Sequence, residues 1–210
     1  MRRPRLILAS ASPRRAALLR QLGIDFDVMP ANVDETPRAG EAVRHYVARL
    51  AFDKSQAVLR AAPPGLPVLG ADTAVDLDGA VLGKPANRDE ALMMLAGLSG
   101  RAHRVFSAVT ISTIERHSQR LAITRVRFRE ISAAERETYW ATGEPQGKAG
   151  AYAIQGMAAV FITTLHGSYS GVMGLPLFET GQLMRDFGIE VLGPWLAWRC
   201  RAAAQTEREI

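Results

Sequence analysis

Residues 103–128, HRVFSAVTISTIERHSQRLAITRVRF, carry the pattern from which the fold class follows. Apolar and polar residues alternate along much of it on both sides of a turn near residues 115–118, which predicts two long antiparallel strands. Before this stretch, short apolar strands alternate with helical patterns. A chain that combines these two arrangements is predicted to have a mixed α/β fold rather than a purely doubly wound sheet.

The other elements follow from apolar periodicity and from capping residues. Asp78-Gly79 is a turn dipeptide and predicts a hairpin. Ser132, with Glu135 three residues later, predicts the start of a helix that ends near residue 142. We further expect strands over 5–9, 26–29, 67–77, 79–82 and 160–165, and helices over 13–22, 40–60, 87–98 and 175–187.

Composition limits the class of protein. The 210-residue chain is 48% hydrophobic and 22% charged, which is typical of a folded globular protein. Its length predicts one domain over 1–210, with the tail after about residue 193 peripheral to it. No apolar run approaches the ~18 residues of a membrane-spanning helix, so we expect no membrane association. The single cysteine, Cys200, excludes an internal disulfide, and we expect a cytoplasmic protein.

The charged residues point to phosphate more than to nucleic acid. Lys and Arg number 26 against 21 Asp and Glu, but they are spread along the chain, so no stable nucleic-acid binding is expected. Only three of the basic residues are lysines: Lys54, Lys84 and Lys148. Lysine is a compact point charge that suits a phosphate group. These three lysines are therefore either phosphate ligands or residues that occur by chance, without a special role, in an arginine-rich chain.

The motif Ser10-Ala-Ser-Pro-Arg-Arg joins the first strand to the first helix. Ser12 is a good N-cap, and Pro13 suits the first helical position. The junction therefore offers free backbone N–H groups and the positive end of a helix dipole to an anion. Arg14 and Arg15 oppose that dipole unless an anion binds, which favours a phosphate site over an ordinary cap with two surface arginines.

Two acidic motifs could serve the same ligand. Asp72 lies in the apolar strand that contains Gly70-Ala-Asp-Thr, and a buried carboxylate is costly unless it is paired or binds a metal. It would then orient a water or hold a cation, or alternatively cap a strand end. Asp34-Glu35 is a loop pair that suits Mg²⁺ or Mn²⁺ or is simply solvated. We expect Asp76 and Asp78, beside the hairpin, to be solvated.

Residues 147–156, GKAGAYAIQG, form a glycine-rich segment that lets the backbone approach a ligand closely. Within it, Gln155 offers both a donor and an acceptor for the edge of a base. The chain has no G-x-x-x-x-G-K-[ST] loop, no G-x-G-x-x-G after the first strand and no G-x-S-x-G, and its histidines lack metal-binding spacing. What is left describes a phosphate-rich ligand with a divalent metal.

Together these motifs resemble the Maf family of nucleoside triphosphate pyrophosphatases, from Leu6 to about Phe187. Gly83-Lys-Pro and Gly171-Val-Met-Gly-Leu-Pro contribute to the match as well. The resemblance implies an elongated mixed sheet with flanking helices, in two lobes around a nucleotide cleft, similar to the inosine triphosphate pyrophosphatases. It also implies a cytoplasmic enzyme, often a homodimer, that depends on Mg²⁺ or Mn²⁺ and cleaves between the α and β phosphates.

The resemblance also implies roles for individual residues. Asp72 falls on the family's general base, and Glu35, together with Asp72, on the metal site. The substrate-binding positions are Ser10, Arg14, Arg15, Lys54, Thr73, Lys84, Lys148 and Gln155. One departure is Gly147, where the family usually has aspartate.

Three of these positions bear on substrate choice. Arg14, Thr73 and Gln155 are the residues of the dTTP/UTP branch, whereas the branch that acts on 7-methyl-GTP typically has an aromatic residue after Ser-Pro. The sequence therefore favours dTTP and UTP as substrates. Two alternatives stay open: a pyrophosphatase for 7-methyl-GTP or CTP, or a cell-division regulator that binds nucleotide or nucleic acid without turnover.

Overall fold

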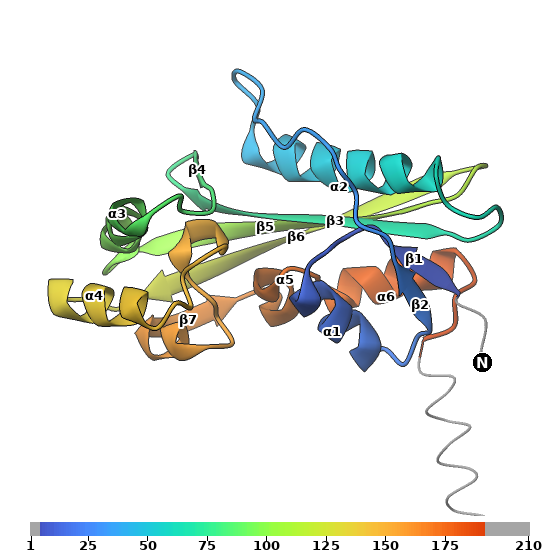
Figure 1. Cartoon of the computed structure of the whole chain (residues 1–210). Coiled ribbons are helices and arrows are strands. Elements are labelled where there is room, and N and C mark those ends of the chain that lie inside the picture. The colour runs from blue at the N-terminus through green and yellow to red at the C-terminus, as the bar shows by residue number, and fades with distance from the viewer. Residues whose placement is uncertain (1–4, 192–210) are drawn as a thin grey trace, which may run out of the picture.

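A single mixed sheet runs through the molecule (Figure 1). The computed structural model describes residues 5–191, so the tail after about residue 193 lies outside the described residues. Within residues 5–191 the sheet has seven strands in the order β2-β1-β3-β5-β6-β7, and β4 pairs with β3. The strands are β1 (Leu6–Leu8), β2 (Phe26–Val28), β3 (Val68–Leu77), β4 (Ala80–Leu82), β5 (Ala102–Ser112), β6 (His117–Phe128) and β7 (Ile162–His166).

The pairing directions confirm the mixed α/β class. β1 is parallel to both β2 and β3, whereas the β3–β5, β5–β6 and β6–β7 pairs are antiparallel. The stretch 103–128 forms the long β5–β6 hairpin, in register from the Ala102–Arg127 pair to the Ser112–His117 pair. Asp78 and Gly79 both have positive φ in the β3–β4 turn, as the hairpin prediction requires.

Helices cover the two faces of this sheet. In Figure 1, α2 lies along one face, α1, α5 and α6 lie on the opposite face, and α3 and α4 gather at one end. Their bounds are α1 (Pro13–Gln21), α2 (Val43–Leu59), α3 (Arg88–Leu98), α4 (Ala133–Ala141), α5 (Tyr169–Met173) and α6 (Leu177–Asp186), with short 3₁₀ turns η1 (Ala149–Ala151) and η2 (Met157–Phe161). None of these helices is long and apolar enough to cross a membrane.

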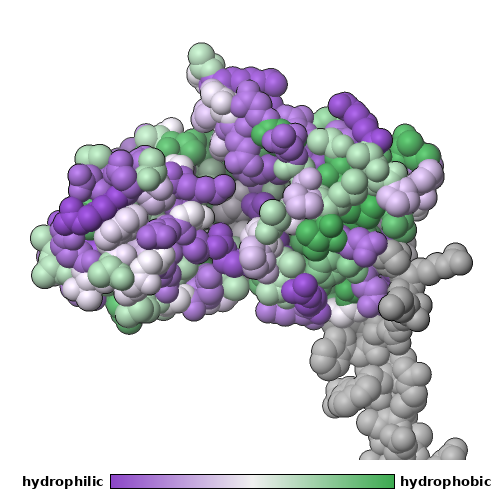
Figure 2. Space-filling view, in the orientation of Figure 1, coloured by the Kyte–Doolittle hydropathy of each residue, from purple (hydrophilic) through white to green (hydrophobic). Residues whose placement is uncertain are grey.

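The sheet faces carry separate apolar clusters. One joins β1, α1 and α6, a second joins α2 to β3 and β5, and a third lies around α3 and α4. Hydrophilic residues gather around the hollow between the two ends of the molecule (Figure 2). The clusters thus fix α1 and α2 on opposite sides of β3, where the candidate site is formed.

Two expectations differ from the structure, and one short helix was not predicted. β7 begins at Ile162 because residues 157–161 form the turn η2, and α5 is too short for a periodic pattern to reveal it. The prediction that Asp76 is solvated is wrong. Its side chain is 1% exposed and accepts a hydrogen bond from Arg104 Nε at 2.8 Å. Burial is tolerated because the guanidinium pairs with the carboxylate.

Candidate active site

The candidate site lies where one edge of β3 has no strand beside it. β1 pairs with β3 at Val68 and Leu69, and β4 pairs with it only from Val75 onward. Residues 70–74 are therefore free along this edge, although β5 pairs with them on the other edge. Binding sites in α/β sheets form where neighbouring strands diverge in this way. A cavity of about 590 Å³ occupies the gap, a size usual for small-molecule sites.

All ten residues proposed from the sequence line this one cavity. They are Ser10, Arg14, Arg15, Glu35, Lys54, Asp72, Thr73, Lys84, Lys148 and Gln155. Segments far apart in the chain are thus brought together by the loops that follow β1 and β4. Asp34 lies outside the cavity, where its carboxylate accepts a hydrogen bond from the Thr36 backbone at 2.9 Å.

The carboxylate side of the cavity faces α2. Lys54 Nζ lies 2.7 Å from Asp72 Oδ1 and 2.6 Å from Glu35 Oε1, so one ammonium group bridges two carboxylates. Asp72 is 6% exposed and Lys54 is 7% exposed. Gly70 makes this contact possible, because a Cβ there would lie 2.2 Å from the Ala51 carbonyl oxygen. Without a side chain at Gly70, α2 packs closely enough on β3 for Lys54 to reach Asp72.

The pKa values of the two carboxyl groups are shifted in opposite directions. Burial raises the pKa of Asp72 above that of an ordinary aspartate, although Lys54 and Arg15 act in the other direction. Partial burial acts to raise the pKa of Glu35 as well, but Lys54, Lys84 and Arg15 outweigh it and the pKa is lowered overall. Asp72 is therefore the better proton acceptor of the pair, and Glu35 stays ionised.

The loop after β1 forms the predicted N-terminal turn. Ser12 caps α1, and its Oγ accepts a hydrogen bond from the Arg15 backbone N–H at 3.4 Å. Arg15 then spans the cavity wall: its Nε donates to the Gly174 carbonyl at 2.8 Å and its Nη1 to Ser10 Oγ at 3.2 Å. This guanidinium is held in place and turned toward the site. The free end of α1 adds the N–H groups and dipole that favour an anion.

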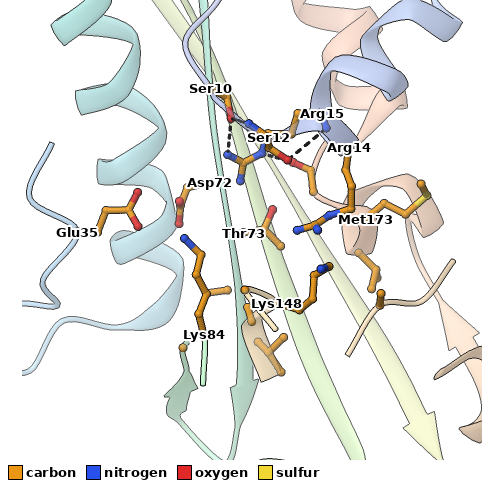
Figure 3. Close-up of a pocket in the computed structure, with 18 of the residues that line it drawn as sticks. Ser10, Ser12, Arg14, Arg15, Glu35, Asp72, Thr73, Lys84, Lys148 and Met173 are labelled. Carbon is orange, nitrogen blue, oxygen red and sulfur yellow. Dashed lines mark hydrogen bonds between the residues drawn. The ribbon is translucent and has the colours of Figure 1, made fainter. Parts of the chain in front are cut away.

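The opposite side of β3 combines a hydroxyl group, an apolar side chain and two cationic side chains (Figure 3). Thr73 points away from Asp72, as alternate strand residues do, and faces Arg14, Lys148 and Met173 (Figure 3). Backbone contacts join the two loops that carry the lysines, because the Gly150 N–H donates to the Gly83 carbonyl at 3.0 Å. The glycine-rich segment thus closes the cavity against the end of β4.

Sequence reasoning missed two residues that shape this side. Glu144 accepts hydrogen bonds from the Met157 N–H at 2.9 Å and from the Tyr139 hydroxyl at 2.7 Å. The same hydroxyl accepts the Ala153 N–H at 3.2 Å. Together they hold the backbone on both sides of Gln155. Nothing in the sequence marks them, because a glutamate after a glycine and a helical tyrosine are common surface and core residues.

The fold and the site together define an α/β protein with a cavity, lined by lysines, arginines and carboxylates, at the free edge of a mixed sheet. The model of the Maf-like protein family matches residues 5–187, and the chain belongs to this family. The resemblance inferred from the motifs is thereby confirmed.

Similar proteins agree over most of the chain. A Methylococcus capsulatus protein named dTTP/UTP pyrophosphatase is 51% identical over 185 residues, which cover 88% of this chain and 92% of that protein. A Bordetella avium protein of the same name is 53% identical over 194 residues, covering 89% and 96%. Among solved structures, the Staphylococcus aureus Ham1 protein matches at 17% identity and a TM-score of 0.41, over 61% of this chain and 72% of its own.

Proposed function

We propose that this chain is a nucleoside triphosphate pyrophosphatase of the dTTP/UTP type, which releases the monophosphate and pyrophosphate. The observation that carries the proposal is the buried Asp72, held by Lys54 beside Glu35 at the free edge of β3. A protein that only binds a phosphate has no need of a carboxylate whose pKa is raised by burial. The names of relatives about half identical over most of the chain support the same activity.

In the proposed reaction, Asp72 accepts a proton from a water molecule as that water attacks the α-phosphorus. A bond forms between the water oxygen and phosphorus, and the bond from phosphorus to the α–β bridging oxygen breaks. Pyrophosphate leaves with that oxygen. Lys54, Lys84 and Arg15 offset the negative charge of the triphosphate. Phosphoryl transfer is accelerated mostly by such positioning and charge stabilisation.

A divalent cation, Mg²⁺ or Mn²⁺, fits the donor set. Within residues 5–191 no group of three or more His, Cys, Asp or Glu side chains is placed to hold a metal alone. Glu35 and Asp72 do supply two carboxylates on the same ammonium group, and Mg²⁺ sites often combine one or two carboxylates with substrate phosphates. The cation would supply positive charge to the triphosphate oxygens. Glu35 and Asp72 would hold it from the α2 side of the cavity.

The base is proposed to lie on the other side of β3. Thr73 and Met173 lie on that side together with Arg14 and Lys148 (Figure 3), and Gln155 lines the same cavity. Thr73 and Gln155 are uncharged hydrogen-bonding groups, and Met173 offers an apolar surface. A pyrimidine presents donors and acceptors along one edge, which Thr73 and Gln155 can distinguish.

Pyrophosphate release tests the proposal directly. The purified full-length chain is incubated with Mg²⁺ or Mn²⁺, or with chelator, and with dTTP, UTP, CTP, GTP and 7-methyl-GTP. We expect metal-dependent release, fastest from dTTP and UTP. Release confined to another nucleotide would support the proposed reaction and contradict the proposed preference for dTTP and UTP. No release from any of them would favour the regulator that binds without turnover. The expected homodimer stays a prediction, which light scattering during size exclusion can test.

A further inference from the structure

The inference starts from a chain of hydroxyl groups behind the cavity. Thr73 Oγ1 lies 3.0 Å from Ser107 Oγ, and Ser107 Oγ lies 2.6 Å from the carbonyl oxygen of Gly171. Ser107 is on β5 directly opposite Thr73 in the sheet register, and it is 1% exposed. Three elements, β3, β5 and α5, therefore meet through a single buried hydroxyl.

The direction of these hydrogen bonds follows from counting protons. A carbonyl oxygen only accepts, so Ser107 donates its one hydroxyl proton to Gly171. Ser107 then has no proton left for Thr73, and Thr73 must be the donor in the contact between them. When the Thr73 hydroxyl donates its hydrogen bond to Ser107, its oxygen can only accept a hydrogen bond from any other partner.

The Gly171 carbonyl is itself fixed in place. The N–H of the same residue donates to Ser168 Oγ at 3.0 Å, and Gly174, at the end of the same short helix, accepts from Arg15. The partner of Ser107 therefore cannot turn away to free its proton. Thr73 lines the cavity, so the polarity of its hydroxyl is imposed on whatever binds there.

We propose that Ser107 is a positioning residue for substrate selection, which makes Thr73 an obligatory hydrogen-bond acceptor for an N–H donor of the substrate base. The donor that fits is the ring imide N–H shared by uracil and thymine. Cytosine has an acceptor nitrogen at that ring position, so two lone pairs would face each other. The proposal rests on the proposed function, and it supplies a physical reason for a preference for UTP over CTP.

The placement of Thr73 supports this assignment. Asp72 and Lys84 lie on one side of the strand, whereas Thr73 lies on the other (Figure 3), and Gln155 lines the same cavity. A neutral hydroxyl with a fixed polarity discriminates donors from acceptors, which a freely rotating hydroxyl does not. Because Ser107 is buried, no water can donate to it in place of Thr73 and so free the Thr73 proton.

The test is the ratio of kcat/KM for UTP to that for CTP in the full chain with metal. In Ser107→Ala, Thr73 is free to rotate and donate, so we expect the ratio to fall by about tenfold, the effect of one hydrogen bond of ~1.4 kcal/mol. Thr73→Val, which removes the acceptor, should lower the ratio similarly. Thr73→Ser keeps the hydroxyl and should keep the ratio.

Ser112→Ala is the matched control. Ser112 is also a buried β5 serine bonded to another hydroxyl, Ser55 Oγ at 2.8 Å, but it lies away from the cavity. It should leave the ratio unchanged. If Ser107 has a purely structural role, Ser107→Ala would lower kcat/KM equally for UTP and CTP. An unchanged ratio in Ser107→Ala would overturn the proposal.

Failure of the proposed function gives a different result. If the unmodified chain releases pyrophosphate from neither UTP nor dTTP, the function itself is wrong and this inference falls with it. If the unmodified chain prefers UTP and Thr73→Val retains that preference, only the inference about Thr73 and Ser107 is overturned.

Discussion

Asp72 and Thr73 are neighbours in the chain, yet they serve opposite sides of the cavity. The Asp72 side is charged: two carboxylates share Lys54. On the other side, Thr73 faces Arg14, Lys148 and Met173 (Figure 3), and the hydroxyl of Ser107 lies behind it. Successive strand residues point to opposite faces, so a single peptide step separates these environments.

The two sides of one free strand edge can therefore support different parts of the reaction. Buried charge suits the developing charge of phosphoryl transfer, because a low dielectric strengthens it. Neutral hydrogen-bonding groups suit discrimination between bases, because an unmatched partner is left unpaired. Changes on the Asp72 side should therefore lower turnover for every nucleotide, and changes on the Thr73 side should alter affinity or preference.

The largest effect is expected for Asp72→Asn. The amide cannot accept the proton of water, so kcat should fall by about 10⁴-fold for every substrate, at the upper end of general-base effects. Pyrophosphate release measures the loss, and thermal unfolding should show that the chain still folds. Asp76→Asn is the matched control, four residues along β3 on the same face but outside the cavity. Asp76→Asn should lower stability, because the ion pair with Arg104 is lost, and should retain activity. If Asp72→Asn retained activity, Asp72 would not be the general base.

Lys54→Met should have the next largest effect. It keeps the length of the side chain but removes the charge between Asp72 and Glu35, so kcat/KM should fall by about a thousandfold. Stability should also fall, because Asp72 loses its bonded cation while staying buried. Arg44→Met, on the exposed face of α2, provides the control. Equal losses for dTTP, UTP and CTP are expected, and a loss confined to one base would contradict the division into two sides.

The third prediction concerns the buried histidine behind the cavity. Tyr152 lines the cavity, and its hydroxyl lies 2.8 Å from Nε2 of the buried His103. Burial lowers the pKa of His103 to about 4, below the ~6.5 of an unfolded histidine. The unfolded chain therefore binds more protons between these values, and stability should fall as pH drops from 6.5 toward 4. The loss should reach about 3 kcal/mol at the lower end.

Urea unfolding from pH 7 to pH 4 measures this loss. His103→Gln does not titrate and should flatten the dependence, whereas His166→Gln, on the exposed end of β7, should leave it as it is. An unchanged slope in His103→Gln would show that other groups govern acid stability.

The smallest effect is expected for Glu144→Ala. The change releases the N–H groups that hold the backbone beyond Gln155. KM for UTP should rise by about tenfold while kcat changes little, because the Asp72 side is untouched. Steady-state kinetics measure the split, with Glu137→Ala on the neighbouring helix as control. A fall in kcat alone would place Glu144 with the charged side instead.

The ten candidate residues that line the cavity could be chosen from the sequence because their motifs lie at chemically recognisable junctions, and their roles stay predictions. Ser12 and Pro13 mark a helix start, and an aspartate within an apolar strand is conspicuous. Ser107, Tyr139 and Glu144 were not predictable in the same way. Each acts through a contact with a distant segment, such as the Gly171 carbonyl or the Met157 N–H, and no local pattern encodes such a contact. Asp76 was misjudged because its partner Arg104 comes from another strand.

Periodicities, caps and turns can be read along the chain, and with them the elements and the mixed class, because they depend on interactions between residues near in the chain. The sequence also determined which residue types were available for phosphate chemistry. Tertiary packing was needed to show that Lys54 bridges Glu35 and Asp72, and that Ser107 lies within hydrogen-bond distance of Thr73. Those arrangements depend on α2 packing against Gly70 and on the register of β3 with β5. Such long-range geometry is set by the whole core, because burial and close packing fix which distant groups meet.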